Sequence, residues 1–186
     1  MPTPGAPLAR VTLESAPGIP ALLPAATLRA LVRRALGAAG APAGAVVGVI
    51  LADDARLAEL NAVHMGKDGP TDVLSFPLLP PSAFPAHAGQ DPALRAAGPA
   101  DGFVLPPGLP VHLGEIVVSV ERAIAQATGG TGGQTGDRGG DPADELRLLL
   151  VHGVLHLCGW DHADAGEETA MRALERAILT GGHGAP

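Results

Sequence analysis

The chain has 186 residues, 46% of them hydrophobic and 2% aromatic, with a formal net charge of −7. This length and composition predict a single domain with an aliphatic core, and the acidic balance disfavours broad, non-specific attraction to nucleic acid while leaving room for a local basic groove. The single cysteine excludes an internal disulfide and a Cys-rich zinc site, and because no apolar run approaches the ~18 residues of a membrane span we expect a cytoplasmic protein without membrane contact.

Strands and helices alternate along most of the chain, as judged from hydrophobic periodicity and from residues that favour helix ends. The predicted elements are, in order, a strand around Val11 and Leu13, a helix at residues 27–39, a strand at 45–52, a helix capped by Asp53 or Asp54, strands at 72–76 and 113–118, a helix capped by Ser119, a helix opened by Asp141 and Pro142, and a last helix capped by Asp164. This order predicts an α+β domain in which a small mixed sheet packs against helices.

Two segments break this alternation. Residues 78–110 are rich in Pro, Ala and Gly and show no helical or strand period, and residues 129–140 are rich in Gly and Thr. We expect both to be flexible insertions within one domain of residues 1–186. The longer insertion could fold over a site as a lid.

The helix that follows the second insertion carries the most informative residues. Consecutive apolar residues at 148–151 make it apolar nearly all round, which predicts a buried helix. His152 and His156 are four residues apart and share one face, Gly159 ends the helix, and His162 follows six residues after the second histidine. This spacing can bring three imidazoles to one metal ion and leave a coordination position open, as in a catalytic zinc site.

An isolated histidine pair at this spacing is more often two hydrogen-bonded helix residues than a metal site. The third histidine favours a metal, because three clustered imidazoles that titrate together near neutral pH are costly unless a metal holds them neutral. Zinc is the expected ion, one per chain, although nickel, copper or cobalt also accept nitrogen ligands. Water bound to such a metal has a pKa of ~7 and supplies hydroxide at neutral pH.

The pattern His-x-x-x-His-x-x-Gly-x-x-His is also the ligand spacing of metzincin proteases, with one difference. Those enzymes carry glutamate directly after the first histidine as the general base, and this chain has Gly153 there. Glycine inside a helix costs ~1 kcal/mol relative to alanine, so we expect another backbone or a substrate to approach Gly153 closely. Cys158 lies on a different side of the helix from His156, where we expect a small core residue.

Residues 152–162, His-Gly-Val-Leu-His-Leu-Cys-Gly-Trp-Asp-His, resemble a signature of the YbeY family of metal-dependent endoribonucleases, with Trp160 where that family usually has tyrosine. Residues 67–77, Lys-Asp-Gly-Pro-Thr-Asp-Val-Leu-Ser-Phe-Pro, are similar to a second motif of the family. Residues 113–119, Leu-Gly-Glu-Ile-Val-Val-Ser, are similar to a third, with Glu115 where aspartate is common. The three motifs occur in the family's order, and the resemblance covers most of residues 45–180.

The resemblance implies a small α+β fold with a metal at one end of a groove. It implies cleavage of RNA with a preference for single strands, in 16S ribosomal RNA maturation at the 3′ end and in ribosome quality control. The implied metal ligands are His152, His156 and His162. The implied partners are single-stranded or ribosomal RNA and the small ribosomal subunit, and the oligomeric state is left open.

The resemblance also assigns roles in the second motif. Lys67, which alone indicates only a solvated loop lysine, matches a catalytic basic residue that meets the RNA phosphate. Thr71, Asp72 and Ser75 are expected to line the groove and bind substrate, although a Thr-Asp pair that begins a strand is as often structural. The family usually has arginine where this chain has Met65, so either another arginine substitutes or RNA binding is weaker.

These residues favour metal-assisted phosphodiester hydrolysis. The metal generates hydroxide or polarises a phosphoryl oxygen, and Lys67 offsets the charge that develops on the phosphorane. Glu115 is a candidate for proton transfer that the sequence does not place near the metal, and attack by the RNA 2′-hydroxyl is left open. Two alternatives are a metalloprotease with a different base and a non-catalytic, metal-dependent factor that binds the ribosome.

Overall fold

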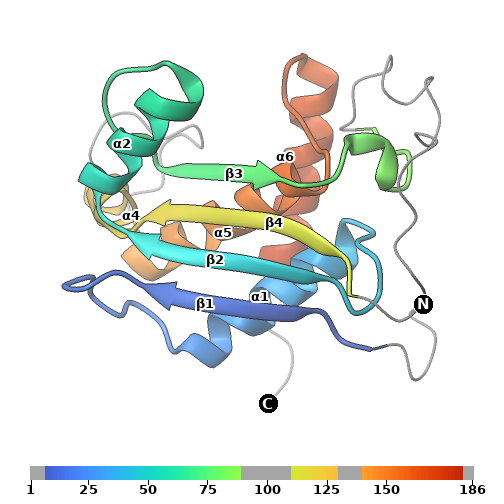
Figure 1. Ribbon diagram of the computed structural model, residues 1–186, viewed down its shortest axis with the longest axis horizontal. Helices are drawn as coiled ribbons and strands as arrows, with labels where there is room; N and C mark the ends of the chain where they lie inside the picture. Colours follow the sequence, from blue (N-terminus) through green and yellow to red (C-terminus); the bar gives the residue numbers. More distant parts are fainter. Residues whose placement is uncertain (1–6, 89–109, 130–139, 182–186) are drawn as a thin grey trace.

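The computed structural model describes residues 7–88, 110–129 and 140–181 (Figure 1). Its elements are, in chain order, β1 Arg10–Ser15, α1 Ala25–Ala38, β2 Val46–Ala52, α2 Asp54–Met65, β3 Val73–Pro77, the 3-10 helix η1 Pro81–Ala83, β4 His112–Ser119, α4 Val120–Ala127, α5 Pro142–Leu157 and α6 Ala165–Thr180. The strands and α-helices lie close to their predicted bounds, and η1 is an element that the sequence did not predict.

The strands form one mixed sheet in the order β1-β2-β4-β3. Strands β1, β2 and β4 run parallel, whereas β3 pairs antiparallel with β4 at the edge. The predicted α+β class with a small mixed sheet is therefore confirmed. In the β3–β4 register Ser75 lies opposite Ile116, and Val73 lies opposite Val118. This edge of the sheet contacts α5.

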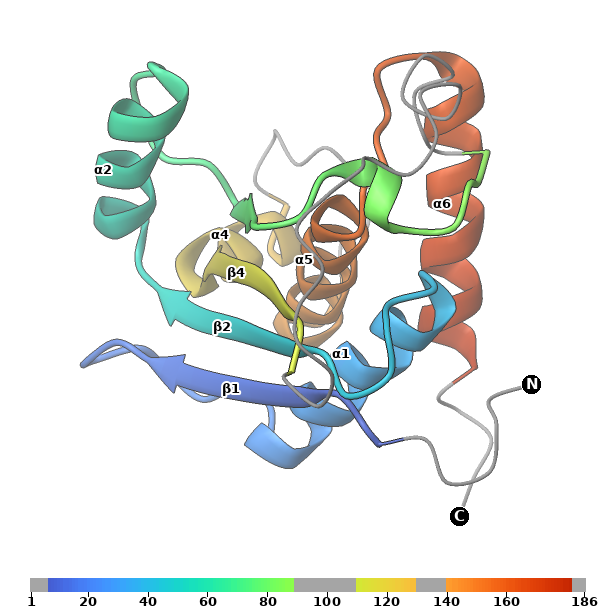
Figure 2. The same cartoon turned by 45° about the vertical axis from the view of Figure 1, so that its right-hand side comes forward.

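Helices α1 and α5 cover one face of the sheet, and α6 packs beyond them (Figure 2). Val47, Val49 and Leu51 point from β2 into the large core on this face. The opposite face carries a smaller cluster of buried residues beneath α2: Ala52, Leu57, Leu74 and Val117. The two faces therefore differ, and α5, which carries His152 and His156, lies on the large-core side.

Helix α5 is the central helix of this core, as its sequence predicts. Residues 148–151 are all between 0% and 2% exposed, so four consecutive aliphatic side chains are buried around the whole helix. Burial of each contributes about 1.5–3 kcal/mol to the free energy of unfolding. The helix starts at Pro142, and the side chain of Asp141 caps it by accepting from the backbone N–H of Ala143 at 2.9 Å. Helix α5 is thus held rigidly at its start and along its length.

Only parts of the two predicted insertions belong to the described residues. At the start of the first, residues 78–88 contain η1 and the buried Phe84, which is 5% exposed and belongs to the large core. Residues 89–109 and 130–139 lie outside the described residues, so the flexibility of the insertions and the single domain stay predictions. Among the described residues, no helix is long and apolar enough to cross a membrane.

Candidate metal centre

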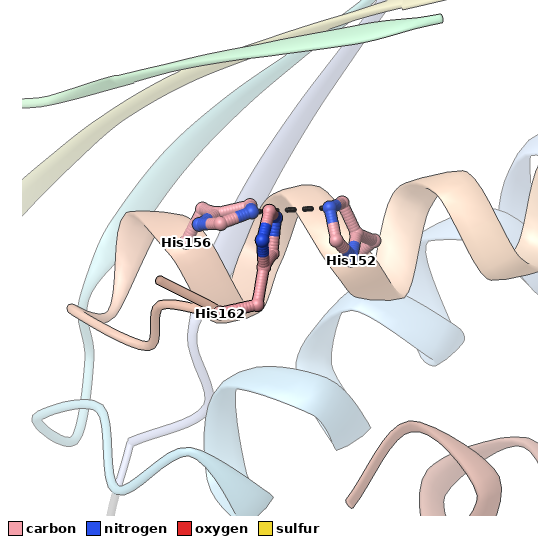
Figure 3. Close-up of side chains that lie close together, drawn as sticks. All are labelled: His152, His156 and His162. Carbon is pink, nitrogen blue, oxygen red and sulfur yellow. Dashed lines mark hydrogen bonds between the residues drawn. The ribbon is translucent and has the colours of Figure 1, made fainter. Parts of the chain in front are cut away.

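The three histidines that the sequence singled out converge in space (Figure 3). His152 and His156 project from α5, His162 lies in the loop between α5 and α6, and one ring nitrogen of each lies within 4.8 Å of the others. The Nε2 atoms of His152 and His156 are 3.0 Å apart. Tetrahedral zinc with nitrogen ligands at about 2.0–2.1 Å needs these atoms roughly 3.3 Å apart. The His152–His156 pair is therefore within a few tenths of an ångström of the required spacing, and the three histidines together could hold one metal ion once the ring of His162 closes on them.

Glu175 orients the first of these rings. The Nδ1 atom of His152 lies 2.7 Å from Glu175 Oε1 on α6, and the two side chains are only 12% and 6% exposed. Donation from Nδ1 to the carboxylate leaves the lone pair of Nε2 directed at the metal position. The sequence alone did not predict this role of Glu175. The spacing carried a signal, since Glu175 shares the buried face of α6 with Met171 and Ile178.

A backbone carbonyl orients the second ring. The Nδ1 atom of His156 lies 2.9 Å from the carbonyl oxygen of Trp160, so Nδ1 donates and Nε2 stays available to a metal. Burial, followed by the charges of His152 and His162, lowers the pKa of His156 from its ordinary value of 6.5 to about 4. The ring is therefore neutral at neutral pH, which is the state that a metal ligand requires.

The loop that carries His162 is anchored at both ends. Gly159 follows α5 with φ +80°, a conformation that favours glycine, and a Cβ atom there would lie 2.8 Å from the Cα atom of Pro81. At the other end Asp164 caps α6 in a capping box with Glu167. The loop between them has few residues, so the backbone of His162 is restrained next to the histidine pair.

Gly153 allows α5 to lie directly on the sheet. A Cβ atom at this position would lie 2.7 Å from Ile116 Cγ2 and 3.0 Å from Val73 Cγ2, and Ser75 Oγ donates to the Gly153 carbonyl at 2.9 Å. The neighbours are sheet side chains, so the expected backbone or substrate at Gly153 is not what the structure shows. A glutamate at 153 would be buried against the sheet, and the position has no room for a metzincin base.

An open groove of about 430 Å³ extends from the histidines along β3. Its lining residues are Met65, Thr71, Asp72, Val73, Leu74, Ser75, Pro77, His152, His156 and His162. The predicted substrate-binding residues and the predicted metal ligands therefore line one groove. No arginine or lysine of the described residues lines it.

Asp72 and Ser75 are both engaged within the protein. The Asp72 carboxylate accepts from the backbone N–H of Val73 at 2.9 Å, from Thr71 Oγ1 at 3.3 Å and from Gln126 Nε2 at 3.3 Å. The hydroxyl of Ser75 donates to α5. Both side chains therefore shape the groove wall as well as lining it.

Comparison with known proteins decides the family. Residues 21–182 match the family model described as Endoribonuclease YbeY. The chain belongs to the YbeY family. Relatives named Endoribonuclease YbeY include that of Moorella thermoacetica, 38% identical over 83% of this chain and 84% of the relative, and that of Salinispora tropica, 41% identical over 81% and 82%. A solution structure from Thermotoga maritima matches over 95% of this chain and 93% of that chain at 20% identity, with a TM-score of 0.49.

Two residues of the YbeY motifs stand apart from the groove. Lys67 is exposed in the loop after α2, where its backbone N–H donates to the Asn61 carbonyl at 3.4 Å, and it is not among the groove lining. Glu115 packs beside Gly48 on the face of the sheet opposite to Ile116, which contacts α5. The sheet separates Glu115 from the histidines, so Glu115 is not placed to transfer a proton there.

Met65, at the position where the resemblance implied arginine, lies on the groove. Its side chain is 48% exposed, and it lines the groove at the end of α2. No arginine among the described residues lines the groove, so none of these takes the place of the guanidinium that the resemblance implied. Cys158, by contrast, is fully buried, and burial raises the pKa of its thiol to about 12, so it is the small core residue that the sequence predicted.

Proposed function

We propose that this protein is a metal-dependent endoribonuclease that cleaves single-stranded RNA in ribosomal RNA processing, at the 3′ end of 16S RNA, and in ribosome quality control. The main support for this proposal is that three histidines converge in one open groove, in a chain whose relatives are named Endoribonuclease YbeY. The proposed setting is the cytoplasm, and the proposed partner is the small ribosomal subunit.

The proposed cofactor is one zinc ion bound by His152, His156 and His162, with nickel or another divalent transition metal as the substitute. Three neutral imidazoles and one open position suit zinc. The fit rests on two hydrogen bonds that commit Nδ1 of His152 and of His156 to protein oxygens, because these leave both Nε2 atoms free for a metal. When bound, the metal lowers the pKa of water and polarises a phosphoryl oxygen.

The chain's own residues position the RNA and the ligands. Ser75 ties the groove wall to α5 through its bond to the Gly153 carbonyl, so the wall and the helix that bears the ligands keep a constant separation. Thr71 and Asp72 form the polar part of the wall near the start of β3. In this proposal Lys67, on the exposed loop just before that wall, supplies positive charge to the phosphate and offsets the charge of the transition state.

The test is cleavage of a single-stranded RNA by the purified protein, with and without a chelator, and by His156→Ala. His112→Ala is the matched control, because His112 is exposed on β4 and does not line the groove. Wild type and His112→Ala should cleave, whereas chelated protein and His156→Ala should not. Equal cleavage by all four samples would indicate a contaminating nuclease and overturn the proposal.

Metal content gives a second, independent measurement. Elemental analysis should find about one zinc ion per chain in wild type and His112→Ala, and much less in His156→Ala, because loss of one of three protein ligands leaves an incomplete site. Wild type without any bound transition metal would contradict the proposed cofactor. Metal binding without RNA cleavage, combined with metal-dependent binding to ribosomes, would favour the non-catalytic alternative.

A further inference from the structure

The beginning of the first insertion touches the loop that carries His162. The imidazole of His87 stacks on the indole of Trp160, with ring centroids 3.9 Å apart and an angle of 7° between the ring planes. Pro81 approaches Gly159 so closely that a Cβ atom on the glycine would lie 2.8 Å from the Pro81 Cα atom. Between these contacts Phe84 is buried in the core. The segment of residues 81–88 is thus anchored in the core and contacts the ligand loop at two points.

Trp160 connects two of the proposed ligands. Its carbonyl oxygen accepts from His156 Nδ1 at 2.9 Å, and it precedes His162 by two residues. Its backbone N–H donates to the Leu155 carbonyl at 3.0 Å, so the backbone is tied to the end of α5. The position of Trp160 therefore determines both the ring orientation of His156 and the path of the chain to His162.

The indole of Trp160 is held by packing. Its Nε1 atom is buried and has no hydrogen-bond partner among the described residues. The stacked imidazole of His87 is consequently a principal restraint on the direction of this side chain. A parallel aromatic pair of this kind contributes free energy beyond its buried area.

We propose that His87 is a positioning residue for the metal centre: its ring holds Trp160 and, through Trp160, holds His156 and His162 in the arrangement that binds a metal. The inference rests on the proposed metal binding. Without the stack the loop populates other conformations, and the apparent metal affinity falls in proportion to the lost binding-competent fraction. The expected loss is about twofold to tenfold, which corresponds to one aromatic pair.

The experiment measures zinc affinity of the full chain by competition with a chromophoric chelator. His87→Ala should bind zinc about twofold to tenfold more weakly than wild type. His87→Phe should restore the affinity, because phenylalanine keeps a flat ring on the indole, and His112→Ala is the control for loss of an exposed histidine. Thermal unfolding of the chelated proteins checks that each variant is folded, and His87→Leu replaces His87→Ala if the latter is not.

Tryptophan fluorescence measures whether His87 stacks on Trp160, and it does not depend on activity. Trp160 is the only tryptophan and the chain has no tyrosine, so intrinsic emission comes from this indole alone. In metal-free protein, His87→Ala should shift the emission to longer wavelength because water reaches the indole, whereas His87→Phe should leave it near the wild-type position. An unchanged spectrum of His87→Ala would contradict the stacked arrangement.

The outcomes separate this inference from the proposed function. Wild-type zinc affinity in a folded His87→Ala whose emission has shifted would overturn the positioning role and leave the ribonuclease proposal intact. Weak binding by both His87→Ala and His87→Phe would also overturn it, because the imidazole would then act by some means other than stacking. Absence of zinc binding by wild type would instead overturn the proposed cofactor.

Discussion

The ligand-bearing region and the exposed segment around the end of α2 are built in different ways. His152 and His156 project from a buried helix, and a carboxylate and a carbonyl fix their rings. Elsewhere on the groove Met65 is 48% exposed, and Lys67 lies on an exposed loop outside the groove lining. If the proposed function holds, rigid packing determines the geometry of metal binding, whereas contact with RNA depends on exposed side chains. We expect substitutions in the first region to cost metal affinity or stability, and substitutions in the second to change RNA affinity alone.

Metal removal should give the largest effect on the ligand-bearing region. Because a metal binds the folded chain and not the unfolded one, a free zinc concentration about a hundred times the Kd adds about 2.7 kcal/mol to the free energy of unfolding. For a chain of this length, chelation should lower the Tm by roughly 5–10 °C. Calorimetry with and without chelator measures this shift, and His162→Ala should abolish it. An equal shift in His162→Ala would mean that the stabilising ion binds elsewhere.

A larger side chain at Gly153 should cause the second-largest loss of stability. Gly153→Val should lower the free energy of unfolding by about 2 kcal/mol, because the added carbons collide with Ile116 and Val73. Gly37→Val is the matched control on α1, since a Cβ atom there meets nothing within 4 Å, and it should change stability by less than about 0.5 kcal/mol. Urea unfolding measures both variants. Equal stability of the two would contradict the close contact between α5 and the sheet.

The carboxylate behind His152 should have a smaller effect on metal binding. Glu175→Gln keeps the size of the side chain but removes its charge, so zinc affinity should fall about tenfold. Glu168→Gln on the exposed face of α6 is the control and should leave the affinity unchanged, because Glu168 pairs with Arg172 and not with a ligand. Competition with a chelator measures both. Unchanged affinity of Glu175→Gln would show that the orientation of His152 does not depend on this charge.

A substitution at Met65 should strengthen RNA binding, whereas the changes above weaken metal binding or stability. Met65→Arg should tighten binding of single-stranded RNA by about threefold at low salt and increase the slope of log K against log salt by about one, because it adds a phosphate contact. Val63→Arg on the same helix is the matched control, since Val63 is 72% exposed and does not line the groove. If both variants tighten binding equally, the gain comes from net charge and not from the groove. Metal affinity should stay constant in both.

Local signals explain what could be predicted. Asp53, Ser119, Asp141 and Asp164 cap their helices with side-chain hydrogen bonds because capping involves only neighbouring residues. The side of the sheet on which the Glu115 side chain lies could not be predicted from such local signals. The β2–β4 register shifts between Val46 and Val47, where the partner on β4 changes from His112 to Gly114. Leu113 is the extra residue, so Leu113 and Ile116 both point into the large core although they are three residues apart. A simple alternation of faces along β4 therefore fails at this point.

The amino-acid sequence by itself determined the order of the elements, the buried character of α5 and the three histidines, because periodicity, caps and ligand spacing all act over a few residues. Only the tertiary structure decided which distant groups meet them: Glu175 behind His152, Ile116 against Gly153, and His87 on Trp160. These pairs join elements that are far apart in the chain, and they depend on how α5, α6 and residues 81–88 pack around the sheet. A pattern within one element carries no information about such contacts.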